Sequence, residues 1–234
     1  MELTPDAIVF AAWGPVHLNA TIVFTWAIDL LAVGLAWRVT SRLTTGVHVS
    51  RWQTLLELIV EAIRNQLAEI APERPERFLP FVGTLFLFIA VSNALVIVPY
   101  YRPPTGSLST TVALAICVFV AVPAFGIAEH GLLGYLRRYA TPSWVMIPFN
   151  IIGEVTRTIA LAIRLFGNIM SGSLIVAMIV ALAPLFFPIV MNALGLLTGL
   201  IQAYIFAVLA AVYIASGVRT QDETAEQPDP GATT

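Results

Sequence analysis

The chain has 234 residues, of which 58% are hydrophobic and only 11% are charged, and its mean hydropathy is +0.86. Soluble domains carry about 25% charged residues, so this composition excludes an ordinary soluble protein and predicts an integral membrane protein. The formal net charge is −2, and the single cysteine, Cys117, excludes an intrachain disulfide. We expect no nucleic-acid partner.

Five apolar segments are long enough to cross a bilayer as α-helices. A span needs about 20 apolar residues, because the hydrocarbon core is about 30 Å thick and a helix rises about 1.5 Å per residue. We therefore predict an all-α membrane protein whose spans cover about residues 18–37, 78–98, 108–128, 144–182 and 189–217. These spans form one membrane domain over residues 1–219, and the acidic, proline-containing segment 220–234 is predicted to be a disordered tail.

Segment 52–70 differs from the spans because its apolar residues recur on one side at helical spacing. The apolar side consists of Leu55, Leu56, Ile59, Ala62, Ile63 and Leu67. The opposite side carries Glu57, Glu61, Arg64 and Glu69. This pattern predicts an amphipathic helix that lies at the membrane interface, ended by the prolines that follow it.

The third span and the segment after it contain residues that interrupt helices. Pro123 lies within the predicted span and indicates a kink there. Gly131, Gly134 and Pro142 predict a loop between this span and the next.

The last two apolar runs are longer than an upright span requires. Residues 144–182 would extend about 58 Å as one helix, against a bilayer core of about 30 Å. Pro184 and Pro188 separate this run from the second. Length alone leaves two interpretations open, a tilted or bent hairpin and two ordinary spans with overhanging ends, because packing sets the tilt.

The placement of arginines predicts the orientation of the chain. All twelve basic residues are arginines, and six of them fall between the first two predicted spans. The loop after the third span holds two more, whereas the loop after the second span has only Arg102. The positive-inside rule therefore predicts an N-terminus outside the cell and a cytoplasmic C-terminus.

Arg164 lies deep inside an apolar run, where a permanently charged guanidinium is costly. Insertion scales assign about 3 kcal/mol to an arginine at the centre of a membrane helix. Glu154, Arg157, Asn168 and Ser171 share its stripe at helical spacing. An ion pair between Glu154 and Arg157 is the favoured interpretation for those two, but no acidic residue lies within one turn of Arg164.

A second polar stripe occurs on the last predicted helix. It consists of Asn192, Gly195, Gly199 and Gln202. A hydrogen bond from Gln202 would orient Arg164, but an amide that joins two membrane helices explains Gln202 equally well. Both interpretations stay open.

Other polar residues inside the spans are isolated. Asp29 and Asn93 are candidates for function because intramembrane polar groups usually have one, although a lone Asn more often joins two helices. The three histidines are not clustered, so we expect no metal site. We find no Walker loop, dinucleotide-binding glycine motif or Ser-His-Asp set, and we expect no cofactor.

Several motifs resemble those of one membrane protein family. Arg164-Leu-Phe-Gly-Asn168, followed by Met170 and Gly172, is similar to the signature of subunit a of F-type ATP synthases. Trp52-Gln-Thr-Leu-Leu-Glu57 resembles the interfacial helix of that family, and Ser92-Asn93 resembles part of its second span. Gln202-Ala-Tyr-Ile-Phe206 resembles its last helix. The resemblance extends over nearly the whole chain.

The resemblance implies a role for Arg164 as the stator arginine, which faces ion-binding carboxylates on a rotating ring of c subunits between two offset half-channels. It implies further partners in peripheral-stalk b subunits and a soluble catalytic head, a bacterial plasma membrane location, and no catalysis by this chain alone. It also favours the tilted hairpin. Candidate ion-pathway residues are Asn168, Gln202, Glu154, Arg157, Asn93, Ser171 and Ser173.

The sequence departs from the family pattern at positions that bear on ion transfer. Ser173 occupies a position that is commonly acidic, and Gly195 one that is frequently histidine. Protons and sodium ions therefore both stay open as the transported ion. A stand-alone secondary transporter or channel is the alternative function, which internal repeats would support; we find no such repeat.

Overall fold

The computed structural model describes residues 9–13, 16–41, 51–72, 75–98, 101–139, 146–182 and 187–219. Its α-helices are α1 (Ala20–Thr40), α2 (Arg51–Ile70), α3 (Pro75–Ala94), α4 (Leu108–Tyr139), α5 (Met146–Leu182) and α6 (Phe187–Arg219). Within the described residues, five helices are long and apolar enough to cross a membrane, namely all of these but α2. The predicted all-α membrane fold is therefore confirmed. The predicted tail, 220–234, lies outside the described residues.

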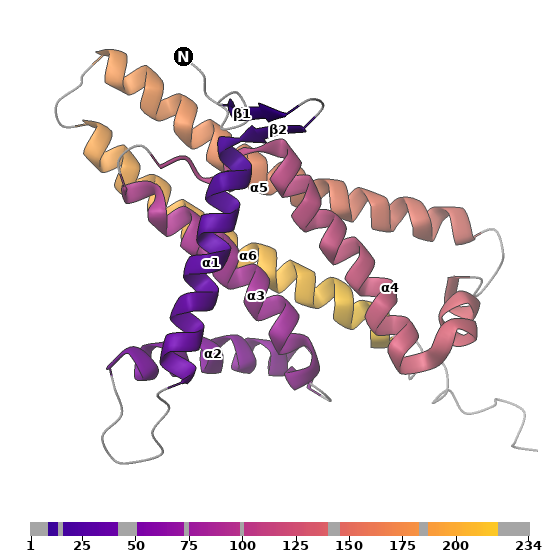
Figure 1. The fold of residues 1–234 in the computed structure, drawn as a ribbon. Helices are drawn as coiled ribbons and strands as arrows, with labels where there is room; N and C mark the ends of the chain where they lie inside the picture. Colours follow the sequence, from indigo (N-terminus) through magenta and orange to yellow (C-terminus); the bar gives the residue numbers. More distant parts are fainter. Residues whose placement is uncertain are drawn as a thin grey trace, which may run out of the picture.

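A short antiparallel hairpin precedes the first helix and was not predicted. It consists of β1 (Val9–Trp13) and β2 (Val16–Asn19), and it lies beside the start of α1 in Figure 1. Its strands are too short to change the class of the fold. Helices account for nearly all of the remaining described chain.

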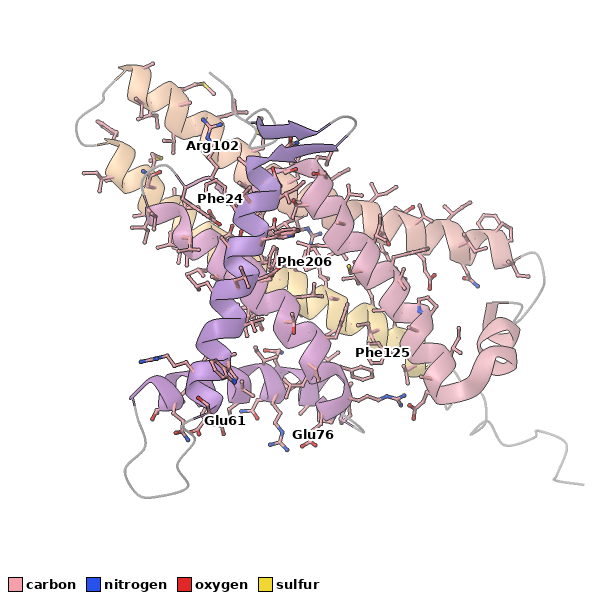
Figure 2. The ribbon with its side chains drawn as sticks, viewed as in Figure 1. Phe24, Glu61, Glu76, Arg102, Phe125 and Phe206 are labelled. Carbon is pink, nitrogen blue, oxygen red and sulfur yellow. The ribbon has the colours of Figure 1, made fainter. Side chains whose placement is uncertain are left out.

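The amphipathic helix α2 lies across one end of the bundle, as Figure 1 shows. Its apolar side packs on α3 and α6, where Leu67 is buried. Glu61 of α2 and Glu76 of α3 point away from the bundle in Figure 2. Arg64 forms an ion pair with Glu76 at 2.6 Å, but both side chains are exposed, so this pair contributes little stability.

The core of the molecule lies where α3, α4, α5 and α6 meet. Phe206 of α6 is fully buried near the centre of the bundle, as Figure 2 shows. The buried side chains around it come from three other helices and include Leu85, Ile89, Val118, Leu161 and Leu165. This core fixes α5 and α6 against the shorter helices α3 and α4.

Helices α5 and α6 form the long hairpin. They contain 37 and 33 residues, which correspond to about 55 and 50 Å and exceed a bilayer core of about 30 Å. Figure 1 shows both helices running obliquely to α1. Pro188 stands in the first turn of α6, where its missing N–H costs no hydrogen bond.

Helix α4 contains the predicted third span and continues beyond it after a break at Gly131. It continues to Tyr139, so the loop predicted from Gly131 to Pro142 is wrong over most of its length. Pro123 lies inside the helix, and the backbone leaves helical geometry at Gly131, where φ is 74° and ψ is 168°. Glycine accepts a positive φ without a steric penalty, so the chain turns at this residue.

Asn93 joins α3, α6 and the connection that follows α3. This connection contains the 3-10 turns η2 (Leu95–Ile97) and η3 (Pro104–Gly106). The Nδ2 of Asn93 donates to the carbonyl of Gly199 at 2.8 Å, and its Oδ1 accepts from Thr105 at 3.1 Å. A Cβ at Gly199 would lie 3.0 Å from side-chain carbons of Asn93, closer than most Cβ contacts, so glycine favours this approach.

A second contact holds the same connection against α3. The hydroxyl of Tyr101 donates to the backbone carbonyl of Ser92 at 3.0 Å, and its ring meets Phe24 of α1 edge to face at 5.1 Å. Burial raises the pKa of Tyr101 to about 12, and the side-chain hydroxyl of Ser92, 3.4 Å from the Tyr101 hydroxyl, opposes this rise. Tyr101 therefore links α1, α3 and the connection while it stays protonated.

We expect Gly199→Ala to destabilise the protein. The new methyl group would press on Asn93, which two hydrogen bonds hold in place. Overpacking costs about 1–3 kcal/mol, which outweighs the gain of about 1 kcal/mol in helix propensity. Thermal unfolding in detergent checks this expectation. Gly195→Ala is the matched control, because a Cβ there has no neighbour within 4 Å. Equal melting temperatures of the two variants would contradict it.

We expect Tyr101 to lose its proton near pH 12 in the folded protein, although a free tyrosine loses it near pH 10. The folded state keeps this proton between these pH values and the unfolded state does not. Tyr101 therefore contributes stability below pH 10 that is lost as the pH rises to 12. Absorbance titration of the protein against Tyr101→Phe measures the pKa. A difference signal centred at pH 10 would be the opposing result.

Candidate functional site

Arg164 lies near the middle of α5 with its side chain exposed. Its neighbours Leu161 and Leu165 are buried in the core. Large apolar side chains are exposed along the same helix, among them Ile152, Val155, Ile159 and Ile163. No hydrogen bond or ion pair joins Arg164 to another described residue. Helix α5 thus carries a guanidinium that is unpaired among the described residues and lies beside an apolar surface.

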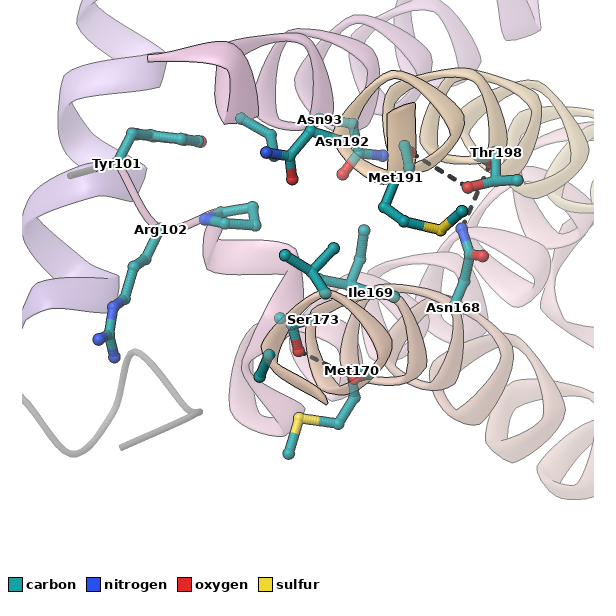
Figure 3. A pocket seen from close by; sticks show the side chains of 17 residues that line it. Asn93, Tyr101, Arg102, Asn168, Ile169, Met170, Ser173, Met191, Asn192 and Thr198 are labelled. Carbon is teal, nitrogen blue, oxygen red and sulfur yellow. Dashed lines mark hydrogen bonds between the residues drawn. The ribbon is translucent and has the colours of Figure 1, made fainter. Parts of the chain in front are cut away.

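A pocket of about 330 Å³ lies between α5, α6 and the connection after α3, and we call it the α5–α6 pocket. It brings together three of the predicted site residues, Asn93, Asn168 and Ser173. Figure 3 shows Asn93 and Asn192 facing the same space, whereas Arg102 points away from it. The pocket is therefore polar at several points inside an apolar bundle.

The polar side chains of α5 have different partners. Asn168 donates through Nδ2 to the carbonyl of Thr198 on α6 at 3.3 Å, as the dashed line in Figure 3 marks. Ser173 donates to the carbonyl of Met170 at 2.8 Å and lines the pocket. Ser171 donates to the carbonyl of Asn168, is exposed, and does not line the pocket. The structure thus separates Ser171 from the other two.

A much smaller recess lies toward the start of α5, and we call it the Tyr213 recess. Its volume is about 20 Å³, which is enough for about one water molecule. It is lined by Val118, Phe119, Val122, Glu154, Arg157, Thr158, Tyr213 and Ser216. Two predicted site residues, Glu154 and Arg157, therefore meet here, at a distance from the α5–α6 pocket.

The predicted ion pair between Glu154 and Arg157 is wrong. The guanidinium of Arg157 lies over the ring of Tyr213, 5.5 Å from its centroid, and no ion pair with Glu154 is formed. Sequence spacing identified Glu154 because it stands on the same helix. It could not identify an aromatic face that α6 brings in from 56 residues away.

Gln202 is buried, and its Nε2 has no hydrogen-bond partner among the described residues. Of the two interpretations that the sequence left open, the hydrogen bond to Arg164 is not formed, and no bond from Gln202 to another described helix is formed either. A buried donor without a partner costs about 1–3 kcal/mol. The amide is therefore available to a group outside the described residues.

Tyr101, Asn192 and Thr198 line the pocket but were not predicted as site residues. Asn192 had a signal in the sequence, because it begins the polar stripe that ends at Gln202. Tyr101 and Thr198 had no such signal in the sequence, because their position in the pocket wall depends on how the connection after α3 folds over α5 and α6. Among the described residues, no group of three or more His, Cys, Asp or Glu side chains forms a possible metal site.

Comparison with known proteins identifies the family. The model of the ATP synthase A chain family matches residues 22–215. Subunit a 1 of the ATP synthase of Chlorobaculum parvum is 56% identical over 224 residues, which cover 96% of this chain and 99% of that protein. Subunit a of Albidiferax ferrireducens is 55% identical over 232 residues, with 99% of each chain covered.

A third relative, ATP synthase subunit a of Nitrosospira multiformis, is 52% identical over 229 residues, which cover 98% of this chain and 91% of that protein. These matches extend over nearly the full length of the chain, including the Arg164 motif and both long helices. The resemblance found in the sequence is thereby confirmed. The chain belongs to the ATP synthase subunit a family, whose members are non-catalytic, multi-pass membrane subunits of the F-type ATP synthase complex.

Proposed function

We propose that this chain is the ion-translocating stator subunit of a rotary F-type ATP synthase, and that Arg164 faces the carboxylates of a ring of c subunits. The observation that carries this proposal is the exposed cation of α5, which has no partner among the described residues. A guanidinium stays charged in a membrane, and the described residues supply no counter-charge, so we assign the counter-charge to another chain. A ring of carboxylates would supply it repeatedly.

Arg164 acts on the ring by electrostatic attraction. It attracts a carboxylate that has released its ion, and it repels a cation that would otherwise pass straight from one side of the membrane to the other. A carboxylate must give up its ion before it reaches the arginine and takes up another after it leaves. Rotation of the ring and ion transfer are coupled by this requirement.

The two cavities support separate routes to the ring. Asn168 and Ser173 follow Arg164 by four and nine residues, about 6 and 14 Å along the helix axis. Arg157 and Glu154 precede Arg164 by seven and ten residues, about 10 and 15 Å in the opposite direction. We assign the α5–α6 pocket to the outer half-channel and the Tyr213 recess to the inner half-channel.

The orientation follows from the arginine distribution. With the N-terminus outside, the fourth span leaves the cytoplasm and the fifth returns to it. The end of α5 and the start of α6 then lie at the outer face, together with the α5–α6 pocket. Peripheral-stalk b subunits and a soluble catalytic head complete the assembly, and the ring carboxylates select protons or sodium ions.

We expect Arg164→Ala to reduce ion-driven ATP synthesis to background while the complex stays assembled. The variant removes the charge that separates the two routes, but it leaves the buried neighbours of Arg164 in place. ATP synthesis in proteoliposomes and the subunit composition of the purified complex are measured together. Arg64→Ala is the matched control, because that arginine forms only an exposed ion pair. Ion-driven ATP synthesis by Arg164→Ala at the rate of the Arg64→Ala control would contradict the proposal.

We expect a cysteine at position 173 to react with water-soluble thiol reagents from the outer side of the membrane. Ser173 lines the α5–α6 pocket, whereas Met178 of the same helix is exposed but does not line it. Ser173→Cys should therefore be labelled much faster than Met178→Cys. Both variants carry Cys117→Ala, because the native thiol is exposed. Equal labelling of the two positions in right-side-out vesicles would argue against this half-channel.

A further inference from the structure

Helix α1 packs against the bundle along one side only. Ala20, Thr21 and Ile28 are buried on this side, and α1 makes its main contacts with α3, η3 and β2. The opposite side carries Trp26, Leu30, Val33 and Trp37, which are 66, 74, 67 and 76% exposed. These four residues recur after four, three and four positions, so they form one continuous stripe on the helix. We call them the α1 stripe.

Asp29 borders this stripe near the middle of the span. It follows Trp26 by three residues and precedes Val33 by four, and its side chain is exposed. Nine residues separate it from Ala20 and nine from Arg38, about 14 Å in either direction. It has no hydrogen bond or ion pair with any described residue, and Arg38 is too far along the axis to pair with it.

Lipid would cover the four apolar residues without cost but would not cover Asp29. An aspartate at the centre of a membrane helix costs about 3 kcal/mol, and such groups face protein and pair with other polar groups. The α1 stripe faces away from the bundle, because α1 meets α3 and the η3 turn on its opposite side. The described part of the chain therefore offers Asp29 no polar partner.

We propose that the α1 stripe docks a transmembrane helix of another subunit, and that this helix presents an arginine or lysine to Asp29. Charge complementarity selects the partner, because a basic side chain at this depth would pair with the carboxylate as it leaves water. Trp26, Leu30, Val33 and Trp37 supply the apolar contact around the pair. The proposal rests on membership of a multisubunit family and not on the role of Arg164.

Retention of subunits in the purified complex tests the charge. We expect Asp29→Asn to lower the amount of one small membrane subunit, relative to this chain, about tenfold after detergent washing, because one member of a buried charge pair is removed. Asp29→Glu keeps the charge and should retain that subunit. Leu31→Ala, an exposed position away from the stripe, is the control for simple truncation. Full retention in Asp29→Asn would overturn the proposal.

A photoreactive residue at Val33 identifies the occupant of the stripe in the intact complex. We expect a crosslink to a membrane segment of another subunit that contains an arginine or lysine. Reversal of both charges, with Asp29→Arg and an acidic residue at the partner's basic position, should restore retention that Asp29→Arg alone abolishes. A crosslink only to lipid, to a second copy of this chain or to a helix without a basic residue would refute the proposal. None of these results depends on ion-driven synthesis.

Discussion

The hydrogen bonds of Asn93 determine how the α5–α6 pocket is built. This one side chain binds the carbonyl of Gly199 on α6 and the hydroxyl of Thr105 in the connection after α3. A polar group buried in a membrane protein must find such partners, since neither lipid nor apolar side chains can supply them. Because Gly199 has no Cβ, the two backbones approach closely enough for the bond to form. The walls of the pocket are held at a fixed separation as a result.

The polar residues of the membrane region divide into two groups by their partners. Asn93 and Asn168 are satisfied inside the chain, each by a carbonyl of α6. Asp29, Arg164 and the Nε2 of Gln202 have no partner among the described residues. The first group holds the helices together. The second group is retained despite its cost, which is the pattern expected of residues that act on neighbouring subunits.

Much of the fold followed from the sequence because the bilayer imposes simple rules. Helix lengths and the amphipathic period predicted the five spans and α2, and the overlong runs predicted the hairpin once the family resemblance was considered. The sequence placed a break at Gly131, where the backbone does leave helical geometry, but it did not predict that the helix resumes and continues to Tyr139. The contact between Arg157 and Tyr213 was missed because it joins residues 56 positions apart, and spacing along one helix carries no information about it.

The separation of the two cavities is the main physical support for the proposed mechanism. A continuous aqueous path across the membrane would dissipate the ion gradient without turning the ring. The α5–α6 pocket holds about 330 Å³ and the Tyr213 recess about 20 Å³, and no single cavity among those described contains residues of both. Between them stand the buried side chains Leu161, Ala162 and Leu165 and the exposed Arg164. In the proposed mechanism the packing of these side chains excludes water and the charge of Arg164 repels cations, so a carboxylate carried on another subunit would be the route between the two sides.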